Sequence, residues 1–454
     1  MKRTYAPSPR RIPELDGLRV LLVFIVSWYH IWQQSWLAPY VGSYSLDYLV
    51  RSGYMPVDGT ILLSGFLLFL PYARSMLLGE PVQDRRWFYR RRLMRIVPSF
   101  YFVTLVMLFA VALPWDLYYT PKNMVKDVFM HLTFTFTFDQ ATYVATPIGV
   151  ASWTLAIEMQ AYLLFPFIAK AAMRKPATIM LGLTAIAWLW RGWCLWAFTD
   201  FNMVVNQLPS FLDVYALGMA AALVYVKLTQ LWQKVKRPLR WQVLATILVA
   251  ACVAALSGLL RAQAGSGAHS NIQAGQMIRR FPLSALVAAL AVALPFTVLP
   301  LRKLMGNRVM AFLAGISMNY YLWHQNLAVH LKRLGIPHSE YDLPNQMGDR
   351  PWQYQYTFLC FALSLLVAVL ATYLVEKPGA KLLKRLFEKR DERRKALYMP
   401  AAREVASGVE AGDTVVLSGL SSEAAEAVVE ALGEKAAVIV TEGKTPGKMD
   451  SIRQ

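Results

Sequence analysis

Hydrophobic residues in this chain gather into long continuous runs, not into the short alternating stretches of a half-buried sheet. A run of about twenty apolar residues is long enough to cross the hydrocarbon core of a bilayer as a helix. Polar and charged segments separate the runs, as expected for loops between membrane helices. The pattern predicts about ten transmembrane helices, at 15–37, 56–73, 96–114, 151–170, 177–198, 209–227, 241–260, 281–300, 309–331 and 353–375.

Lysine and arginine are unevenly divided between the two sets of loops that these helices create. With the N-terminus in the cytoplasm, the inside segments hold 32 basic residues and the outside segments hold 10. Short cytoplasmic loops carry the excess of Lys and Arg in membrane proteins. We therefore expect an all-α polytopic protein of the cytoplasmic (inner) membrane, with both ends of its membrane domain in the cytoplasm.

Segment 115–150 is long for a loop and contains the apolar, Thr/Phe-rich stretch Val128–Phe138. Loops of this length usually carry structure of their own. We expect this stretch to form a short re-entrant or interfacial helix on the outer face.

The composition changes after the last predicted span. We expect a transmembrane domain at 1–385, a basic cytoplasmic linker at 386–399 and a small cytoplasmic α/β tail at 400–454. The tail reads as strand, helix and strand, with Ser421 as the N-cap and Gly433 as the C-cap of its helix. A unit this small has little core of its own. It is therefore expected to pack on the membrane domain or on a protein partner.

Composition supports the membrane prediction and narrows the function classes. The 454 residues are 56% hydrophobic, and the net charge is +19. Because the basic residues lie between membrane-length runs, the charge indicates topology and no nucleic-acid partner. The three cysteines lie far apart in apolar stretches, which predicts buried thiols and no metal site.

Ionisable residues inside the predicted spans are the candidate site, because burying them in a bilayer is costly. His30, Glu158 and His324 lie in three different spans, each about seven residues or about 10 Å from the outer end. Asp58 lies nearer the outer face. This common depth, in helices that run in opposite directions, is not required by packing alone.

A second set of charges lies at the cytoplasmic ends of the spans. Arg90, Arg91, Arg92 and Arg95 form a run there, and Arg19 lies at a similar level in the first span. Arginines in this position can hold a phosphorylated donor through forked hydrogen bonds.

Each of these residues also has a structural interpretation. A lone intramembrane histidine is about as often a packing residue as a functional one, and an arginine run more often sets topology than binds a ligand. Asp58 could cap its helix, and Ser64-Gly65 could serve close helix packing. Taken together, and with Glu158 well inside a span, the set favours a functional site.

The residue types support acid–base transfer. A neutral histidine can take a proton from a hydroxyl as that hydroxyl attacks a carbonyl, and a carboxylate can orient the imidazole. No Gly-x-Ser-x-Gly, P-loop, His-Glu-x-x-His or Rossmann glycine pattern occurs in the sequence.

Six blocks, in order over about 1–385, resemble motifs of the acyltransferase 3 family of integral-membrane acyltransferases. The blocks are Arg19 and His30 with ten residues between them, Pro56–Phe66, Arg92–Tyr101, Trp153–Pro166, Ser317–His324 and Tyr373–Pro378. Pro56 stands where the family has Gly, Thr154 where it commonly has Ser, and Gln325 where a Pro often follows the histidine. The charged positions are intact.

The resemblance implies transfer of an acyl group, commonly acetyl from acetyl-CoA as co-substrate, to a hydroxyl of an envelope or exported sugar. No cofactor is expected to stay bound. His30 is expected to be the general base or an acyl relay, with Glu158 and Asp58 orienting or tuning it. Donor binding is expected of Arg19, Arg92 and Arg95, and the acceptor pocket of His324, Ser64 and Tyr321.

Other functions fit parts of the pattern. A proton-coupled transporter also buries charges at a common depth, but paired halves with broken helices are not visible in the sequence. The acceptor could instead be a lipid or a small secondary metabolite. A non-enzymatic assembly factor is a third reading, suggested mainly by the tail.

Overall fold

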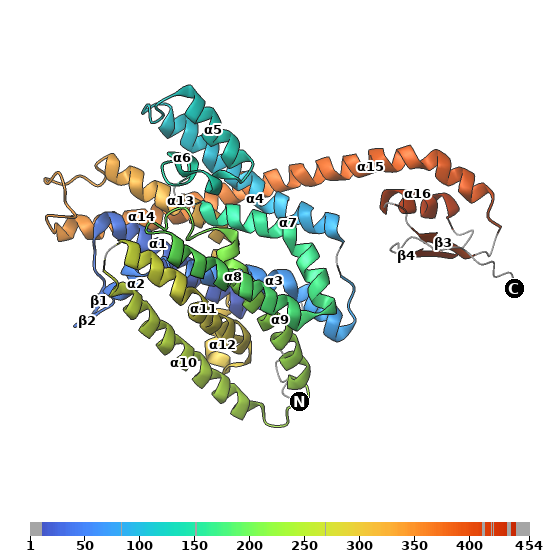
Figure 1. Cartoon of the computed structure of the whole chain (residues 1–454), viewed down its shortest axis with the longest axis horizontal. Helices are drawn as coiled ribbons and strands as arrows, with labels where there is room; N and C mark the ends of the chain where they lie inside the picture. Colours follow the sequence, from blue (N-terminus) through green and yellow to red (C-terminus); the bar gives the residue numbers. More distant parts are fainter. Residues whose placement is uncertain are drawn as a thin grey trace. The chain divides into compact units, whose positions relative to one another are not determined.

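The computed structural model describes residues 11–82, 84–149, 152–267, 269–410, 414–418, 420, 422–433 and 437–441. The chain divides into two compact units, Met1–Lys377 and Pro378–Gln454. The first unit is a bundle of long helices (Figure 1). These are α1 (Glu14–Ser35), α3 (Val57–Leu78), α4 (Arg85–Met107), α7 (Trp153–Arg174), α8 (Pro176–Ala197), α9 (Leu212–Trp232), α10 (Pro238–Ala264), α11 (His269–Ala293), α13 (Arg308–Arg333) and α14 (Arg350–Ala371).

Shorter elements connect the long helices. The hairpin strands β1 and β2 pair antiparallel between α1 and α3. The connecting elements are β1 (Tyr40–Val41), β2 (Tyr44–Ser45), α2 (Asp47–Arg51), η1 (Leu108–Ala112), α5 (Pro121–Leu132), η2 (Phe136–Phe138), α6 (Gln140–Tyr143), η3 (Leu208–Phe211), η4 (Leu294–Phe296), α12 (Leu299–Met305) and η5 (Thr372–Glu376).

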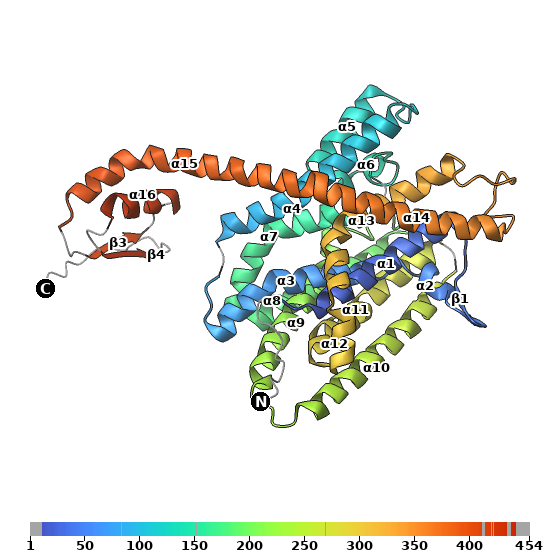
Figure 2. The same ribbon diagram turned by 180° about the vertical axis from the view of Figure 1, so that it is seen from behind.

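Nine helical stretches among the described residues are long and apolar enough to cross a membrane, so the chain is a multi-pass membrane protein. They coincide with nine of the ten predicted spans. The remaining prediction, 309–331, corresponds to α13, which is less apolar because polar side chains interrupt it. Several of these are buried, among them Asn319, His324 and Asn326. Since α13 packs against both α1 and α14 (Figure 2), these buried polar side chains lie among other helices.

The centre of the bundle depends on a close approach of α3 and α9. A Cβ atom on Gly218 of α9 would lie 2.6 Å from the carbonyl oxygen of Leu62 and 2.7 Å from the backbone nitrogen of Phe66. A Cβ atom on Gly65 of α3 would lie 3.2 Å from the Cα of Tyr215. Small residues allow membrane helices to pack this closely. Gly65 therefore serves close helix packing, one of the interpretations that its sequence context suggested.

Replacing Gly218 with valine is expected to force α3 and α9 apart. Overpacking of this kind costs about 1–3 kcal/mol or more, which corresponds to a clear fall in the thermal unfolding midpoint. Gly182→Val on α8 is the matched control, because no atom lies within 4 Å of a Cβ built there. Thermal unfolding in detergent measures both variants, and equal midpoints would contradict the packing described here.

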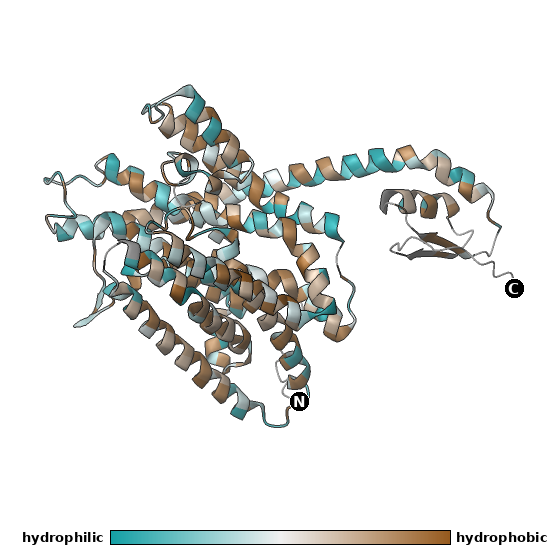
Figure 3. Cartoon of the chain, in the orientation of Figure 1, coloured by the Kyte–Doolittle hydropathy of each residue, from teal (hydrophilic) through white to brown (hydrophobic). Residues whose placement is uncertain are grey.

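Apolar residues predominate along several of the long helices, among them α10, as contact with lipid requires (Figure 3). On α8, Leu189 is 74% exposed, and on α10 the side chains of Leu239 and Ile247 are also exposed. Because α8 and α10 bury few of their residues, they form the outer layer of the described bundle.

The helix in segment 115–150 lies earlier in the chain than predicted. It spans Pro121–Leu132 instead of 128–138, because the Thr120 side chain accepts a hydrogen bond from the Asn123 N–H and Pro121 occupies the first turn. Asp127 inside this helix is buried and accepts a 2.7 Å hydrogen bond from the Tyr118 hydroxyl. Burial together with this carboxylate raises the pKa of Tyr118.

Two helices also begin earlier than the predicted spans. The carboxylate of Asp84 accepts hydrogen bonds from two backbone N–H groups and starts α4 at Arg85 instead of 96. Helix α11 starts at His269 instead of 281. Arg280, which the sequence placed in a loop, therefore lies inside a helix and is fully buried.

The second unit is a small α/β body. It consists of α15 (Lys377–Ser407), β3 (Thr414–Ser418), α16 (Ser422–Leu432) and β4 (Ala437–Thr441). The two strands pair in parallel, and Gly433 follows α16 with a φ of 56°, the conformation expected of a C-cap glycine. The predicted N-cap, Ser421, lies outside the described residues. The expected linker 386–399 is part of the continuous helix α15, and an ion pair joins Lys395 to Glu430.

Candidate active site

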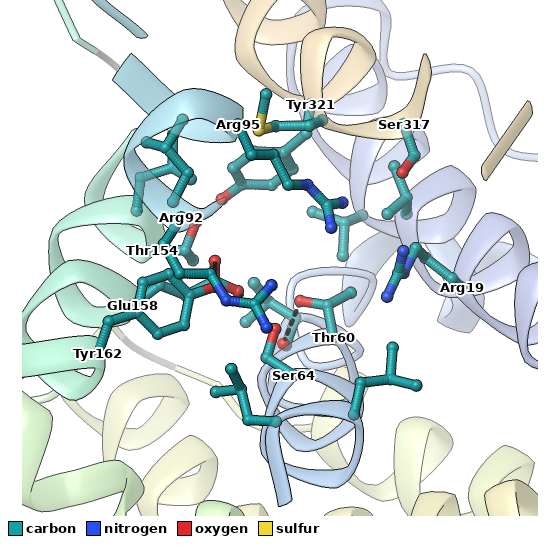
Figure 4. A pocket seen from close by; sticks show the side chains of 18 residues that line it. Arg19, Thr60, Ser64, Arg92, Arg95, Thr154, Glu158, Tyr162, Ser317 and Tyr321 are labelled. Atoms are coloured by element: carbon teal, nitrogen blue, oxygen red, sulfur yellow. Dashed lines mark hydrogen bonds between the residues drawn. The ribbon is translucent and has the colours of Figure 1, made fainter. Parts of the chain in front are cut away.

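A polar cavity of about 110 Å³ lies inside the bundle, between α1, α3, α4, α7 and α13. Its polar lining comes from Arg19, Thr60, Ser64, Arg92, Arg95, Thr154, Glu158, Tyr162, Ser317 and Tyr321 (Figure 4). Six of the nine predicted site residues are in this set: the three arginines, Glu158, Ser64 and Tyr321. Residues from five separate helices thus meet at one place.

Helix α4 places two of the arginines in the cavity. Because Arg92 and Arg95 are three residues apart in a helix, they lie on the same face. The guanidinium of Arg92 lies 5.5 Å from the ring centroid of Tyr162 and 5.4 Å from that of Phe88. Its buried Nε has no hydrogen-bond partner among the described residues. Arg92 is therefore held by aromatic contacts and keeps an N–H group available to bind a ligand.

Arg19 reaches the same space from α1, on the other side of the cavity (Figure 4). Within the described part of the chain, no carboxylate lies within ion-pair distance of Arg19 or Arg95. Three arginines face a single carboxylate, that of Glu158, so the cavity carries an excess of positive charge. Such a site favours an anionic ligand, and guanidinium groups match phosphate oxygens in geometry.

Glu158 is held by neighbours within the cavity. Its Oε1 accepts a 2.8 Å hydrogen bond from the Ser64 hydroxyl, and its Oε2 accepts a 2.9 Å hydrogen bond from the Tyr162 hydroxyl. Tyr162 follows Glu158 by one helical turn on α7, which is why both face the same space. The carboxylate hydrogen-bonds within the arginine-lined cavity, whereas the hydrogen-bond partner of His30 is Gln33.

His30 and His324 form a pair, with ring centroids 5.2 Å apart. The Nδ1 of His30 lies 3.0 Å from Oε1 of Gln33, whose own Nε2 donates to the Tyr29 hydroxyl. The Nδ1 of His324 lies 2.6 Å from the carbonyl oxygen of Tyr321. Since both Nδ1 atoms face acceptors, both are assigned the proton, and each Nε2 keeps its lone pair. That of His324 is buried without a partner among the described residues.

The histidine pair lies one helical turn beyond the cavity. Val26 lines the cavity and His30 follows it by four residues on α1, while Tyr321 lines the cavity and precedes His324 by three on α13. Four residues of helix correspond to about 6 Å along the axis. The arginines, the carboxylate and the imidazoles are therefore arranged in series along the bundle.

Asp58, which was expected to orient or tune His30, forms an ion pair with Arg280. It is fully buried and accepts a 3.2 Å hydrogen bond from Nε of Arg280 on α11. Arg280 also donates to the carbonyl of Val205 at 2.9 Å and to Asn206 Oδ1 at 3.1 Å. Asp58 therefore joins α3 to α11 and to the segment before α9. Arg280 is a structural residue that the sequence did not reveal, because its partner lies 222 positions away.

Four further lining residues, Thr60, Thr154, Tyr162 and Ser317, were not among the predicted site residues. Helical spacing was the signal that could have found them. Thr60 precedes Ser64 by four residues, Thr154 and Tyr162 lie four residues either side of Glu158, and Ser317 precedes Tyr321 by four.

Comparison with known proteins identifies related sequences. The sequence model of a family described as an acyltransferase domain matches residues 12–375. O-acetyltransferase OatA of Staphylococcus aureus (strain NCTC 8325 / PS 47) is 28% identical over 189 residues, 38% of this chain and 27% of that protein. Peptidoglycan O-acetyltransferase OatA of Listeria monocytogenes is 27% identical over 209 residues, 42% of this chain and 30% of that protein. The matches thus span less than a third of these relatives' length. No solved structure matches.

Proposed function

Since this chain belongs to the acyltransferase 3 family, we propose that it is an acyl-CoA-dependent O-acyltransferase. It moves an acyl group, acetyl in the simplest case, to a hydroxyl of a cell-envelope sugar such as peptidoglycan. The names of the two relatives support O-acetylation, and one of them names peptidoglycan. The observation that carries the proposal is the cavity with three arginines, next to a histidine pair whose Nε2 atoms are assigned as free bases.

The arginines bind the phosphates of the CoA donor from the cytoplasmic side of the inner membrane. The sidedness follows from the basic loops, which favour cytoplasmic ends for α1 and α4 near Glu14 and Arg85. Two of the basic residues counted for the outside, Arg191 and Arg280, are buried in ion pairs, so the asymmetry among loop residues is larger than the sequence count. The acceptor sugar approaches from the opposite end, where His30 and His324 lie.

The chemistry is direct acyl transfer assisted by a general base. Nε2 of His30 takes the proton of the acceptor hydroxyl as the hydroxyl oxygen forms a bond to the thioester carbonyl carbon. The C–S bond then breaks, and the CoA thiolate leaves and takes up the proton. His324, with its own unpartnered Nε2, lines the acceptor side. Glu158 offsets part of the arginine charge and, with Ser64 and Tyr162, fixes the shape of the donor cavity.

Removing a cavity arginine is expected to weaken donor binding. A hydrogen bond to a charged group contributes about 1.5–3 kcal/mol, so Arg19→Gln or Arg95→Gln should raise KM for acetyl-CoA about tenfold to a hundredfold. Arg91→Gln is the matched control, because Arg91 is exposed on the same helix as Arg95 and does not line the cavity. KM is measured from the rate of CoA release. Unchanged KM values in both cavity variants would show that these arginines do not bind the donor.

The proposed function is tested by incubating the purified protein with radiolabelled acetyl-CoA and peptidoglycan. We expect label in the glycan as an alkali-sensitive ester, and CoA release that depends on the glycan. Failure to label any envelope glycan, together with no saturable binding of acetyl-CoA, would overturn the proposal.

A further inference from the structure

A second cavity lies beside the arginine-lined one and differs from it in character. It has a volume of about 210 Å³ and lies between α1, α13 and α14. Its walls include Val20, Leu313, Ile316 and Phe361, and none of the described residues that line it is charged. We call it the side groove.

The few polar groups of the side groove are already hydrogen-bonded. The Ser317 hydroxyl donates to the carbonyl of Ala314 at 2.9 Å, and the Tyr320 hydroxyl shares a 3.0 Å hydrogen bond with that of Ser27. A sugar or a phosphate placed there would lose its hydration without gaining partners. The groove therefore suits a hydrocarbon ligand.

Only a thin wall separates the side groove from the arginine-lined cavity. Val23 and Ser317 line both, so two small side chains form the partition. At its other end the groove reaches Tyr320, whose ring stacks on that of His324 with centroids 6.2 Å apart. The groove thus adjoins the donor cavity across this partition and reaches the ring that stacks on His324.

The outer edge of the groove opens towards the surface of the bundle that faces lipid. Phe24 is 39% exposed and Leu365 is 40% exposed at this edge. A hydrocarbon chain that starts at the histidine pair could therefore extend along the groove into an apolar environment without crossing a polar barrier.

We propose that the side groove binds the hydrocarbon chain of a fatty acyl donor, so that the protein transfers medium-chain acyl groups as well as acetyl. This inference rests on the proposed function. The bonds made and broken are the same as for acetyl: the ester C–O bond forms, the thioester C–S bond breaks, and the hydroxyl proton passes to His30. The occupant is the donor's chain, not a bilayer lipid, because the groove shares Val23 and Ser317 with the donor cavity and reaches the ring that stacks on His324.

The test compares acetyl-, butyryl- and octanoyl-CoA as donors for the full-length protein in lipid nanodiscs, with peptidoglycan as acceptor. We expect glycan-dependent CoA release from all three donors. Leu313→Trp and Val20→Phe fill the groove and should lower the octanoyl-to-acetyl rate ratio about tenfold or more, since several methylene groups lose their binding surface. Leu189→Trp, on the lipid-facing side of α8, should leave the ratio unchanged.

A labelling experiment on the unsubstituted protein keeps the proposal testable if a variant does not fold. Octanoyl-CoA carrying a photoreactive group at the chain end should label peptides that contain 20–24 or 313–320, and unlabelled octanoyl-CoA should displace it. Labelling that unlabelled octanoyl-CoA does not displace would overturn the inference. Transfer of acetyl but not of octanoyl groups would overturn it too. The second result would leave the proposed function standing. No transfer from any donor to any envelope glycan, together with no saturable binding of acetyl-CoA, would overturn both.

Discussion

Replacement of His30 by alanine is expected to slow acyl transfer by about a hundredfold to ten-thousandfold, the usual contribution of a positioned general base. Gln33 accepts from Nδ1 of His30 and thereby leaves Nε2 to act as the base. Alanine removes that base without altering the arginines that are proposed to hold the donor. We therefore expect kcat to fall while the affinity for acetyl-CoA stays near its original value.

The measurement is single-turnover acetyl transfer to peptidoglycan, combined with equilibrium binding of acetyl-CoA. His338→Ala is the control, because His338 is exposed and lies between α13 and α14. Gln33→Leu should give an intermediate loss, since it frees the imidazole to change tautomer. If His30→Ala transfers acetyl at a rate close to that of the original protein, His30 is not the base.

The second large effect is expected in stability. Asp58→Ala leaves the guanidinium of Arg280 fully buried without its carboxylate, a change that costs about 3–5 kcal/mol when a buried ion pair is broken. Arg280 keeps its bonds to Val205 and Asn206, but these partners are neutral. A marked fall in the thermal unfolding midpoint should follow.

A double variant separates this structural role from the catalytic role expected of Asp58. Asp58→Leu combined with Arg280→Leu removes both charges, so most of the lost stability should return. If Asp58 acts only by joining α3 to α11, acetyl transfer should return with it. A double variant that is as stable as the original protein but inactive would assign Asp58 to the chemistry.

The sequence was sufficient to predict much of the site, because helix geometry fixes depth. Arg19, Arg92 and Arg95 were predicted to lie at one level, at the cytoplasmic ends of two spans, and in the structure all three line one cavity. Glu158 was placed nearer the outer face, at the level of His30 and His324, but it lines the arginine cavity. What depth alone does not give is the rotation of each helix. Glu158 was therefore expected to orient His30, whereas its hydrogen bonds go to Ser64 and Tyr162.

The first residues of the helices were also predicted less accurately than the membrane-spanning parts. Apolar runs locate the membrane-buried part of a helix, whereas a capping residue decides where the helix begins. Asp84 extends α4 to include the arginine run, and α11 extends back past Arg280. Arg280 lies on α11 and Asp58 on the neighbouring helix α3, 222 positions apart in the sequence. Neither local sequence therefore predicts this buried ion pair.

The central proposal is directional: we propose that the donor enters at the arginine end and the acceptor at the histidine end. Proteoliposomes of one orientation, verified by protease removal of an N-terminal tag, separate the two faces. Label should enter the glycan when radiolabelled acetyl-CoA is supplied on the face of the N-terminus and the glycan on the other. Equal labelling when both substrates are supplied only on the face opposite the N-terminus would contradict the account.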